Sequence, residues 1–183
     1  MVALETPSLN KNWQAPNFSL PGTDGKHHTL ADVSGKNGLL VIFMCNHCPF
    51  VKAILHKIIR DAKELQAQGI GVVAISANDA NNYPEDSFEN MQHLSNENEL
   101  PFPYLLDETQ EVAKAYDAVC TPDFFGFNQK SQLQYRGRLD DAGLNDKPDS
   151  TRELYNAMSL IATTNTGPEE QKPSIGCSIK WKK

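Results

Sequence analysis

The chain has 183 residues, of which 39% are hydrophobic and 22% are charged, and its formal net charge is −6. A chain of this length can bury a full hydrophobic core as one domain, so it needs no disulfide scaffold to fold. The acidic balance disfavours a broad phosphate-binding surface, and we expect no nucleic-acid partner. No stretch approaches the roughly 18 apolar residues of a membrane span, and the first residues lack the pattern of a signal peptide. We therefore expect a cytoplasmic protein without a membrane span.

The first third of the chain predicts an N-terminal extension followed by a buried strand. Glycine, proline, aspartate and asparagine gather at residues 21–25 and 34–38, which indicates a hairpin or an irregular flap. The six apolar residues 39–44 then predict a strand that is buried on both faces. That strand leads directly into Cys45.

The middle of the chain predicts a β-α-β unit and an insertion. Apolar positions between residues 51 and 65 follow helical spacing, and residues 70–76 form a second buried run. The two strands are therefore expected to be parallel, with a right-handed crossover. After them we expect a helix from 84–86 to about 94, a short strand at 101–106 and a helix at 108–116.

The last third predicts a hairpin, a helix and a tail. Residues 124–127 and 133–139 are expected to pair around a polar turn. A helix is expected from about Ser150, with Glu153 at its capping-box position. We interpret the chain as a single domain over residues 1–183, with a core at about 14–165 and a C-terminal tail at 166–183.

Cys45 and Cys48 form a Cys-Asn-His-Cys motif between the predicted strand and helix. This placement predicts that Cys45 lies at or near the helix N-terminus, where free amide groups lower its pKa, and that Cys48 lies one turn later. The spacing also predicts two sulfurs close enough to form a disulfide. His47, when protonated, would stabilise the thiolate and make that disulfide more oxidising. We therefore predict a redox-active dithiol pair.

A metal or haem site is the alternative interpretation of the same motif. A four-cysteine zinc site usually pairs two Cys-x-x-Cys units, whereas Cys120 and Cys177 are single cysteines. A c-type haem would need histidine directly after Cys48, where Pro49 stands. We expect no metal and no cofactor, but Cu(I) or Zn binding by the two cysteines and His47 stays open.

A Cys-Thr-Pro sequence at residues 120–122 precedes the predicted hairpin. Together with the strand-helix Cys-x-x-Cys, it resembles the thioredoxin superfamily, in which that proline is cis and faces the active cysteines. The segment FSLPGTDG at 18–25, the insertion and the run YRGR at 135–138 resemble the peroxiredoxin-like branch, the alkyl hydroperoxide reductase / thiol-specific antioxidant proteins and the TlpA/ResA-like reductases. The resemblance covers about residues 14–165.

This resemblance implies an α/β thioredoxin-like fold, with a central mixed β-sheet flanked by helices, an N-terminal β extension and a β-α insertion. It implies that Pro122 faces the cysteines and that Thr121 offers backbone groups to a bound peptide. Cys120 would then be an extra thiol near the pair, or simply a small buried residue. Cys177 would be a resolving or regulatory thiol on a returning tail, or a packed tail residue.

The sequence departs from both family patterns. Classical peroxiredoxins place Pro and Thr or Ser ahead of the peroxidatic cysteine, where this chain has Gly38 and Ile42. The hydroxyl that would orient a peroxide is missing, and Arg136 is the candidate for the cation. Thioredoxins carry a buried Asp six residues before the first cysteine, where Leu39 stands. The proton acceptor for Cys48 is thus open between His47, Asp123 and water.

We predict a thiol-disulfide oxidoreductase in which Cys45 attacks a substrate disulfide and Cys48 resolves the mixed disulfide. The alternative is a thiol peroxidase, in which Cys45 becomes a sulfenic acid and condenses with Cys48. An adaptor that uses the same cleft only for binding is a further possibility. The expected partners are a disulfide-containing protein or a small thiol or peroxide substrate, and an external reductant such as a thioredoxin-type system.

Overall fold

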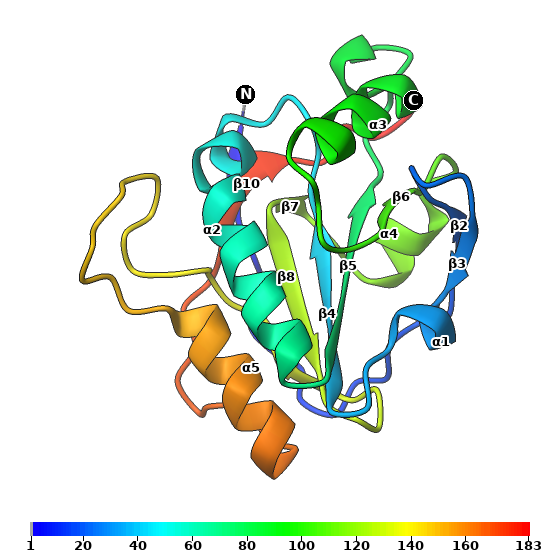
Figure 1. Cartoon of the computed structure of the whole chain (residues 1–183). Helices are drawn as coiled ribbons and strands as arrows, with labels where there is room; N and C mark the ends of the chain where they lie inside the picture. The colour runs from blue at the N-terminus through cyan, green and yellow to red at the C-terminus, as the bar shows by residue number, and fades with distance from the viewer. Residues whose placement is uncertain (1) are drawn as a thin grey trace.

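The structure is a computed structural model and describes residues 2–183. Its centre is a five-stranded mixed sheet in the order β6-β5-β4-β8-β9 (Figure 1). Strand β4 is central, parallel to β5 and antiparallel to β8. All six of its residues are buried, as the uninterrupted apolar run predicts. The strands are β4 Gly38–Phe43, β5 Ile70–Ser76, β6 Tyr104–Leu106, β8 Asp123–Phe127 and β9 Leu133–Tyr135.

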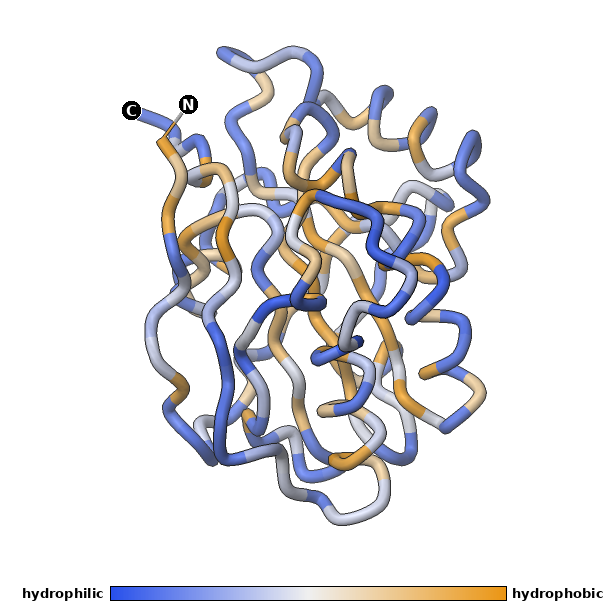
Figure 2. Tube along the Cα trace, turned by 90° about the vertical axis from the view of Figure 1, so that its left-hand side faces the viewer, coloured by the Kyte–Doolittle hydropathy of each residue, from blue (hydrophilic) through white to orange (hydrophobic). Residues whose placement is uncertain are grey.

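Helices cover both faces of this sheet and divide the core into two clusters. Leu40 and Ile42 of β4 pack in one cluster with residues of α2 and α5, whereas Val41 and Phe43 pack in the other with Tyr116. This alternation follows from the opposite directions of successive side chains in a strand. Hydrophobic segments lie along the central strands, and hydrophilic ones along the outer loops and helix surfaces (Figure 2). The helices are α1 Leu30–Val33, α2 Pro49–Ala67, η1 Pro84–Asp86, α3 Phe88–Glu97, α4 Glu111–Ala115 and α5 Glu153–Thr164.

A second sheet joins the two ends of the chain to its middle. Strand β10 (Ile175–Ser178) lies between β1 (Ala3–Glu5) and β7 (Cys120–Thr121), antiparallel to both (Figure 1). The apolar character of the tail was recognised in the sequence, but its partners were not, because a strand's own pattern does not identify the edge with which it pairs. A separate hairpin of β2 (Ser19–Pro21) and β3 (His27–Thr29) forms the N-terminal β extension.

The architecture confirms the predicted α/β thioredoxin-like fold, with its β-α-β unit, its β-α insertion and a cis peptide bond at Thr121–Pro122. Two helix starts differ from the prediction. The helix expected from 84–86 is a 3-10 turn followed by a separate helix, because Ser87 is the N-cap of α3. The last helix begins at Glu153 rather than near Ser150, and Glu153 pairs with Arg138 instead of forming a capping box.

Within residues 2–183, no helix combines the length and apolar character needed to cross a bilayer.

Candidate functional site

The Cys-Asn-His-Cys segment occupies the short loop between β4 and α2. Helix α2 begins at Pro49, and Cys48 is its N-cap residue. Proline suits the first helical position because it lacks the N–H group that would have no partner there. Cys45 therefore lies in the loop, three residues before the cap. The prediction that Cys45 marks the helix N-terminus is wrong, and Pro49 was the signal in the sequence that places Cys48 there.

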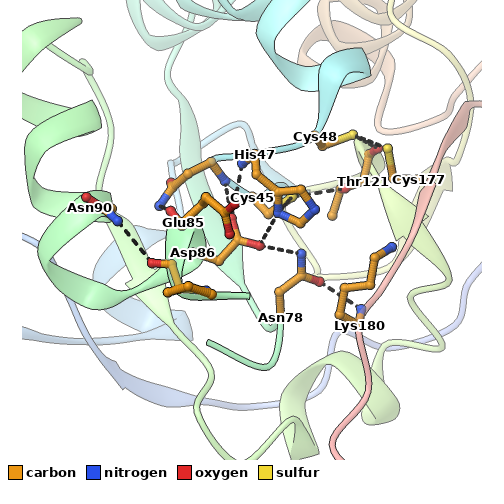
Figure 3. A network of polar contacts seen from close by, with 12 residues as sticks. Cys45, His47, Cys48, Asn78, Glu85, Asp86, Asn90, Thr121, Cys177 and Lys180 are labelled. Atoms are coloured by element: carbon orange, nitrogen blue, oxygen red, sulfur yellow. Dashed lines mark hydrogen bonds and ion pairs between the residues drawn. The ribbon is translucent and has the colours of Figure 1, made fainter. Parts of the chain in front are cut away.

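Three of the four cysteines meet beside Thr121 (Figure 3). The Cys48 thiol donates to the Thr121 backbone oxygen at 3.1 Å, and its Sγ lies 2.7 Å from Cys177 Sγ. The Cys45 Sγ lies 3.5 Å from Thr121 Oγ1. Cys45, Cys48 and Cys177 are only 1%, 0% and 2% exposed, and all are free thiols. The structure thus brings together the predicted pair, the residue before the proline and a tail cysteine.

The backbone beside the cis proline is already paired. Cys177 of β10 stands opposite Thr121, so the edge that was expected to receive a bound peptide holds the chain's own C-terminal strand. Gly176 makes this approach feasible, because a Cβ at that position would lie 2.1 Å from the Thr121 carbonyl oxygen. Pro122 is therefore next to the cysteines, as the resemblance implied, but β10 covers its edge.

The pKa values of the two cysteines of the motif are shifted in opposite directions. Interaction with the Cys45 thiol lowers the pKa of Cys48 to about 4 against the opposing effect of burial, with help from Cys177, Thr121 and the Val51 backbone. The pKa of Cys45 is raised, first by its hydrogen bond with Cys48, then by burial and by the negative charge of Asp86. The predicted lowering of the Cys45 pKa is therefore wrong. It occurs at Cys48, which holds the helix N-terminus.

His47 lies beside Cys45, but its strongest partner is a carboxylate. Its Nδ1 is 4.0 Å from Cys45 Sγ and 2.5 Å from Asp86 Oδ2. Its ring also stacks on Tyr83, with 5.6 Å between the ring centroids. The same ring nitrogen thus faces both the thiol and the carboxylate. The stabilising role of His47 toward a thiolate stays a prediction.

Asp86 is a fully buried carboxylate that sequence reasoning missed. It accepts hydrogen bonds from the backbone N–H groups of Asn46 and His47, at 2.8 and 3.1 Å, and from Asn78 Nδ2 at 2.8 Å (Figure 3). It therefore fixes the loop that carries Cys45. The available signal was its place after β5, because the carboxyl ends of neighbouring parallel strands meet at one sheet edge.

Arg136 and Cys120 lie outside the contacts of the cysteine pair in the described part of the chain. Arg136 Nη2 binds Asp123 Oδ2 at 2.9 Å, and its guanidinium lies 4.4 Å from the centroid of the Phe125 ring. Both partners of this ion pair are buried. The Cys120 thiol donates to the Pro122 oxygen at 3.6 Å, and burial raises its pKa. The structure therefore places Arg136 in an ion pair rather than beside Cys45, and it engages Asp123, a candidate proton acceptor.

Two further features surround the pair. Cys45, His47 and Asp86 bring three potential metal-ligand atoms within 4.8 Å of one another. Beside the cis proline, a hollow of about 290 Å³ is lined mainly by apolar side chains, which include Phe50, Pro122 and Ile175. Chemically, the site can support thiol exchange, and its thiolate and imidazole could hold a soft metal ion.

Comparisons with known proteins give a curated oxidoreductase and solved structures of uncharacterized proteins. The curated thiol-disulfide oxidoreductase ResA of Bacillus subtilis (strain 168) is 28% identical over 126 residues, which are 69% of this chain and 66% of ResA. The match thus spans slightly less than two thirds of that relative. A crystal structure of an uncharacterized conserved protein from Geobacillus kaustophilus is 47% identical, with a TM-score of 0.94, and covers 100% of this chain and 97% of the other.

A hypothetical protein from Sinorhizobium meliloti 1021 has a similar crystal structure, with 38% identity and a TM-score of 0.91 over 97% of this chain and 98% of the other. The family model described as "AhpC/TSA family" matches residues 12–136. This match includes the cysteine pair, the cis proline and all five strands of the central sheet. It ends before helix α5, which packs on that sheet. The chain belongs to the AhpC/TSA family of redoxins, within the thioredoxin superfamily.

Proposed function

We propose that this protein is a thiol-disulfide oxidoreductase in which Cys45 and Cys48 cycle between a dithiol and a disulfide. The observation that carries the proposal is geometric: the sulfurs of Cys45 and Cys48 both contact Thr121 beside the cis proline. A thiolate is the nucleophile in thiol-disulfide exchange, and the lowered pKa of Cys48 favours that form. Family membership and the likeness to ResA support the same class of reaction.

The opposite pKa shifts assign the roles within the pair. The Cys48 thiolate attacks one sulfur of a substrate disulfide, and the other substrate sulfur leaves as a thiolate. Cys45 then gives up its proton and attacks Cys48 Sγ, which forms the Cys45–Cys48 disulfide and releases the second substrate thiol. The directions of the two pKa shifts favour Cys48 over Cys45 as the sulfur that loses its proton for the first attack. This order reverses the one predicted from the sequence, in which Cys45 was the nucleophile.

Substrate access requires movement of the covering segments, because Cys45 and Cys48 are almost fully buried. The apolar hollow beside Phe50, Pro122 and Ile175 offers a surface for side chains that flank a substrate disulfide. We therefore propose a protein disulfide as substrate and a dithiol system as the reductant that restores the reduced site.

Reduction of insulin disulfides by dithiothreitol tests this function. We expect the wild type to accelerate the reaction and the Cys48→Ser variant to lose about 100-fold or more of that rate, as is typical when a nucleophile is removed. Cys120→Ser is the matched control, because that thiol is equally buried but donates to the Pro122 backbone oxygen. Full activity of Cys48→Ser, or no acceleration by the wild type, would overturn the proposal.

Peroxidase activity is less well supported by the site. Ile42 stands where peroxiredoxins carry a hydroxyl, and Arg136 is engaged with Asp123. Cys45 also retains its proton because its pKa is raised. We expect peroxide consumption by the reduced protein to be slow relative to insulin reduction, and the reverse ratio would favour the peroxidase.

A soft-metal site is a second candidate function, and the three ligand atoms of Cys45, His47 and Asp86 are the observation that favours it. Metal analysis of protein purified under reducing conditions tests this candidate. About one Zn or Cu per chain that is lost in Cys45→Ser would support a metal site, and a metal-free protein with full reductase activity would eliminate it.

A further inference from the structure

The C-terminal strand β10 takes the place of a substrate at the proposed site. Extended peptides bind to exposed sheet edges by adding a strand, and the edge beside the cis proline is where a substrate of the proposed oxidoreductase would pair. In this protein β10 already pairs with β7, and its register sets Cys177 directly opposite Thr121. A cysteine thus occupies the position in which a substrate would present its own sulfur.

The sulfur of Cys177 is aimed at Cys48. Their Sγ atoms lie 2.7 Å apart, which is between the length of a disulfide bond, about 2.05 Å, and the contact distance of two non-bonded sulfurs. In Figure 3 the two side chains point toward each other from α2 and β10. A small movement therefore suffices to form a bond.

Several contacts fix this geometry on both sides of Cys177. The Ser174 hydroxyl donates to the Pro122 oxygen at 3.0 Å, and the Ser178 N–H donates to the Val2 oxygen at 3.0 Å. Gly176 lets the strand lie directly on the Thr121 carbonyl, where a side chain would collide. Strand β10 thus approaches Thr121 more closely than the packing of Ile175 or Ile179 against the core would require.

The surroundings of Cys177 suit a thiol that reacts second. Burial, with the hydrogen bond to Cys48, raises its pKa to about 11, and the Lys180 ammonium opposes this shift. The directions of these shifts favour a thiolate at Cys48 over a thiolate at Cys177. Cys177 therefore does not compete with Cys48 as the first nucleophile, and it becomes one only when Cys48 is already bonded to a substrate.

We infer that Cys177 is a second resolving thiol, which converts a Cys48–substrate mixed disulfide into an internal Cys48–Cys177 disulfide. In this step Cys177 loses its proton and attacks Cys48 Sγ, so that the Cys48–Cys177 bond forms and the bond from Cys48 to the substrate breaks. The substrate sulfur leaves with the electron pair of the broken bond and takes up a proton. One disulfide replaces another, so the step needs no external oxidant.

This inference rests on the proposed function, and it makes Cys48 the sulfur shared by two internal disulfides. Cys45 and Cys177 approach Cys48 from different elements, the loop after β4 and the strand β10. Either can resolve the same mixed disulfide. A protein that lacks Cys45 should therefore still release its substrate.

Oxidised glutathione is the probe, and the intact mass of the reduced protein is the readout. We expect Cys45→Ser to gain one glutathione at Cys48 and then to lose it, with a Cys48–Cys177 disulfide found by peptide mapping. The double variant Cys45→Ser/Cys177→Ser should hold the adduct about tenfold longer or more, because it lacks the adjacent thiol. Cys45→Ser/Cys120→Ser is the matched control and should release glutathione like Cys45→Ser.

The outcomes separate this inference from the proposed function. If Cys45→Ser keeps its glutathione as long as the Cys177 double variant, or never takes up glutathione, the role of Cys177 is overturned, while insulin reduction by the wild type leaves the oxidoreductase standing. If the wild type itself reduces no disulfide, the proposed function falls. Cys45→Ser/Cys177→Ala repeats the test with a second side chain, and thermal unfolding of each variant verifies that the tail strand is folded.

Discussion

The two sulfurs of the motif lie in contrasting surroundings. Cys45 belongs to a loop held by the buried carboxylate of Asp86, and it faces the ring of His47. Its pKa is raised, first by the hydrogen bond with Cys48 and then by burial and by the charge of Asp86. Cys48 caps a 19-residue helix and contacts Thr121 and Cys177, and its pKa is lowered. Pro49 occupies the first helical position, so the helix begins directly after Cys48 and Cys45 stays in the loop.

The difference teaches that spacing and charge are separate properties of a dithiol motif. The three-residue spacing brings Cys45 and Cys48 together in either arrangement. Which sulfur loses its proton more readily depends first on the hydrogen bond between Cys45 and Cys48, then on burial and on the negative charge of Asp86 beside Cys45. The variants below alter the surroundings of each sulfur in turn, in order of decreasing expected effect.

The largest effect is expected on the Cys48 side, from Gly176→Val. The added side chain would collide with the Thr121 carbonyl oxygen, so β10 must move away from β7. Loss of about 2 kcal/mol of strand docking, typical for overpacking, exposes Cys48 about 30-fold more often. Timed alkylation of the reduced protein, with peptide mapping to Cys48, measures this change.

Ile175→Val is the matched control, because this neighbour in the same strand is 47% exposed and the substitution keeps its branched shape. Its alkylation rate should equal that of the wild type. An unchanged rate in Gly176→Val would mean that β10 does not cover Cys48.

The next effect is expected on the Cys45 side, from Asp86→Asn. The amide keeps an oxygen for the Asn46 and His47 N–H groups but removes the charge that raises the Cys45 pKa. In a Cys48→Ser background, the pH midpoint of Cys45 alkylation should fall. Its rate at neutral pH should rise on the order of tenfold, as expected for a charge within 5 Å at the effective dielectric of a protein.

Glu85→Gln provides the control for Asp86→Asn, because it removes the same charge from an exposed neighbour. A midpoint that moves equally in Glu85→Gln would show that the effect is general electrostatics rather than the buried carboxylate.

The sequence was sufficient to predict the fold and the closeness of Cys45 and Cys48, and the reasons are local. The apolar run of β4, the helical spacing in α2 and the proline after Thr121 are each readable within a few residues. The helix start was readable too, since Pro49 favours the first helical position, but the prediction followed the usual placement of the first cysteine instead.

Asp86 and the position of Cys177 could not be predicted in the same way. Asp86 is 40 residues from the loop that it fixes, and Cys177 is 129 residues from Cys48. Both contacts depend on which strands lie side by side and on which edge the tail pairs with. These are tertiary choices, and the local pattern of either segment is compatible with several of them.

A third prediction concerns the pH dependence of stability in the reduced protein. The folded-state pKa of Cys48 lies at about 4, below its ordinary value of 9.0, so the unfolded chain binds one more proton between these values. The free energy of unfolding should therefore rise with pH across this window, by up to about 1.4 kcal/mol per pH unit from this group, and the contribution is lost as the pH falls toward 4.

Urea unfolding of reduced wild type and Cys48→Ser at several pH values isolates that contribution. The stability difference between the two proteins should increase from about pH 5 to about pH 8. A difference that does not change with pH would mean that Cys48 keeps its proton when folded.

The smallest effect is expected from Cys120→Ala, although this residue is adjacent to Thr121. Successive residues of a strand point to opposite sides, so Thr121 faces the cysteine pair while the Cys120 thiol reaches the Pro122 oxygen. Its loss should cost about 1 kcal/mol of stability and leave the alkylation rate of Cys48 and the rate of insulin reduction unchanged. A clear fall in the reduction rate would add Cys120 to the exchange pathway. Strand register therefore predicts better than proximity in sequence to the cis proline which thiol lies beside Cys48. Register brings the distant Cys177 to Cys48 and turns the neighbouring Cys120 away.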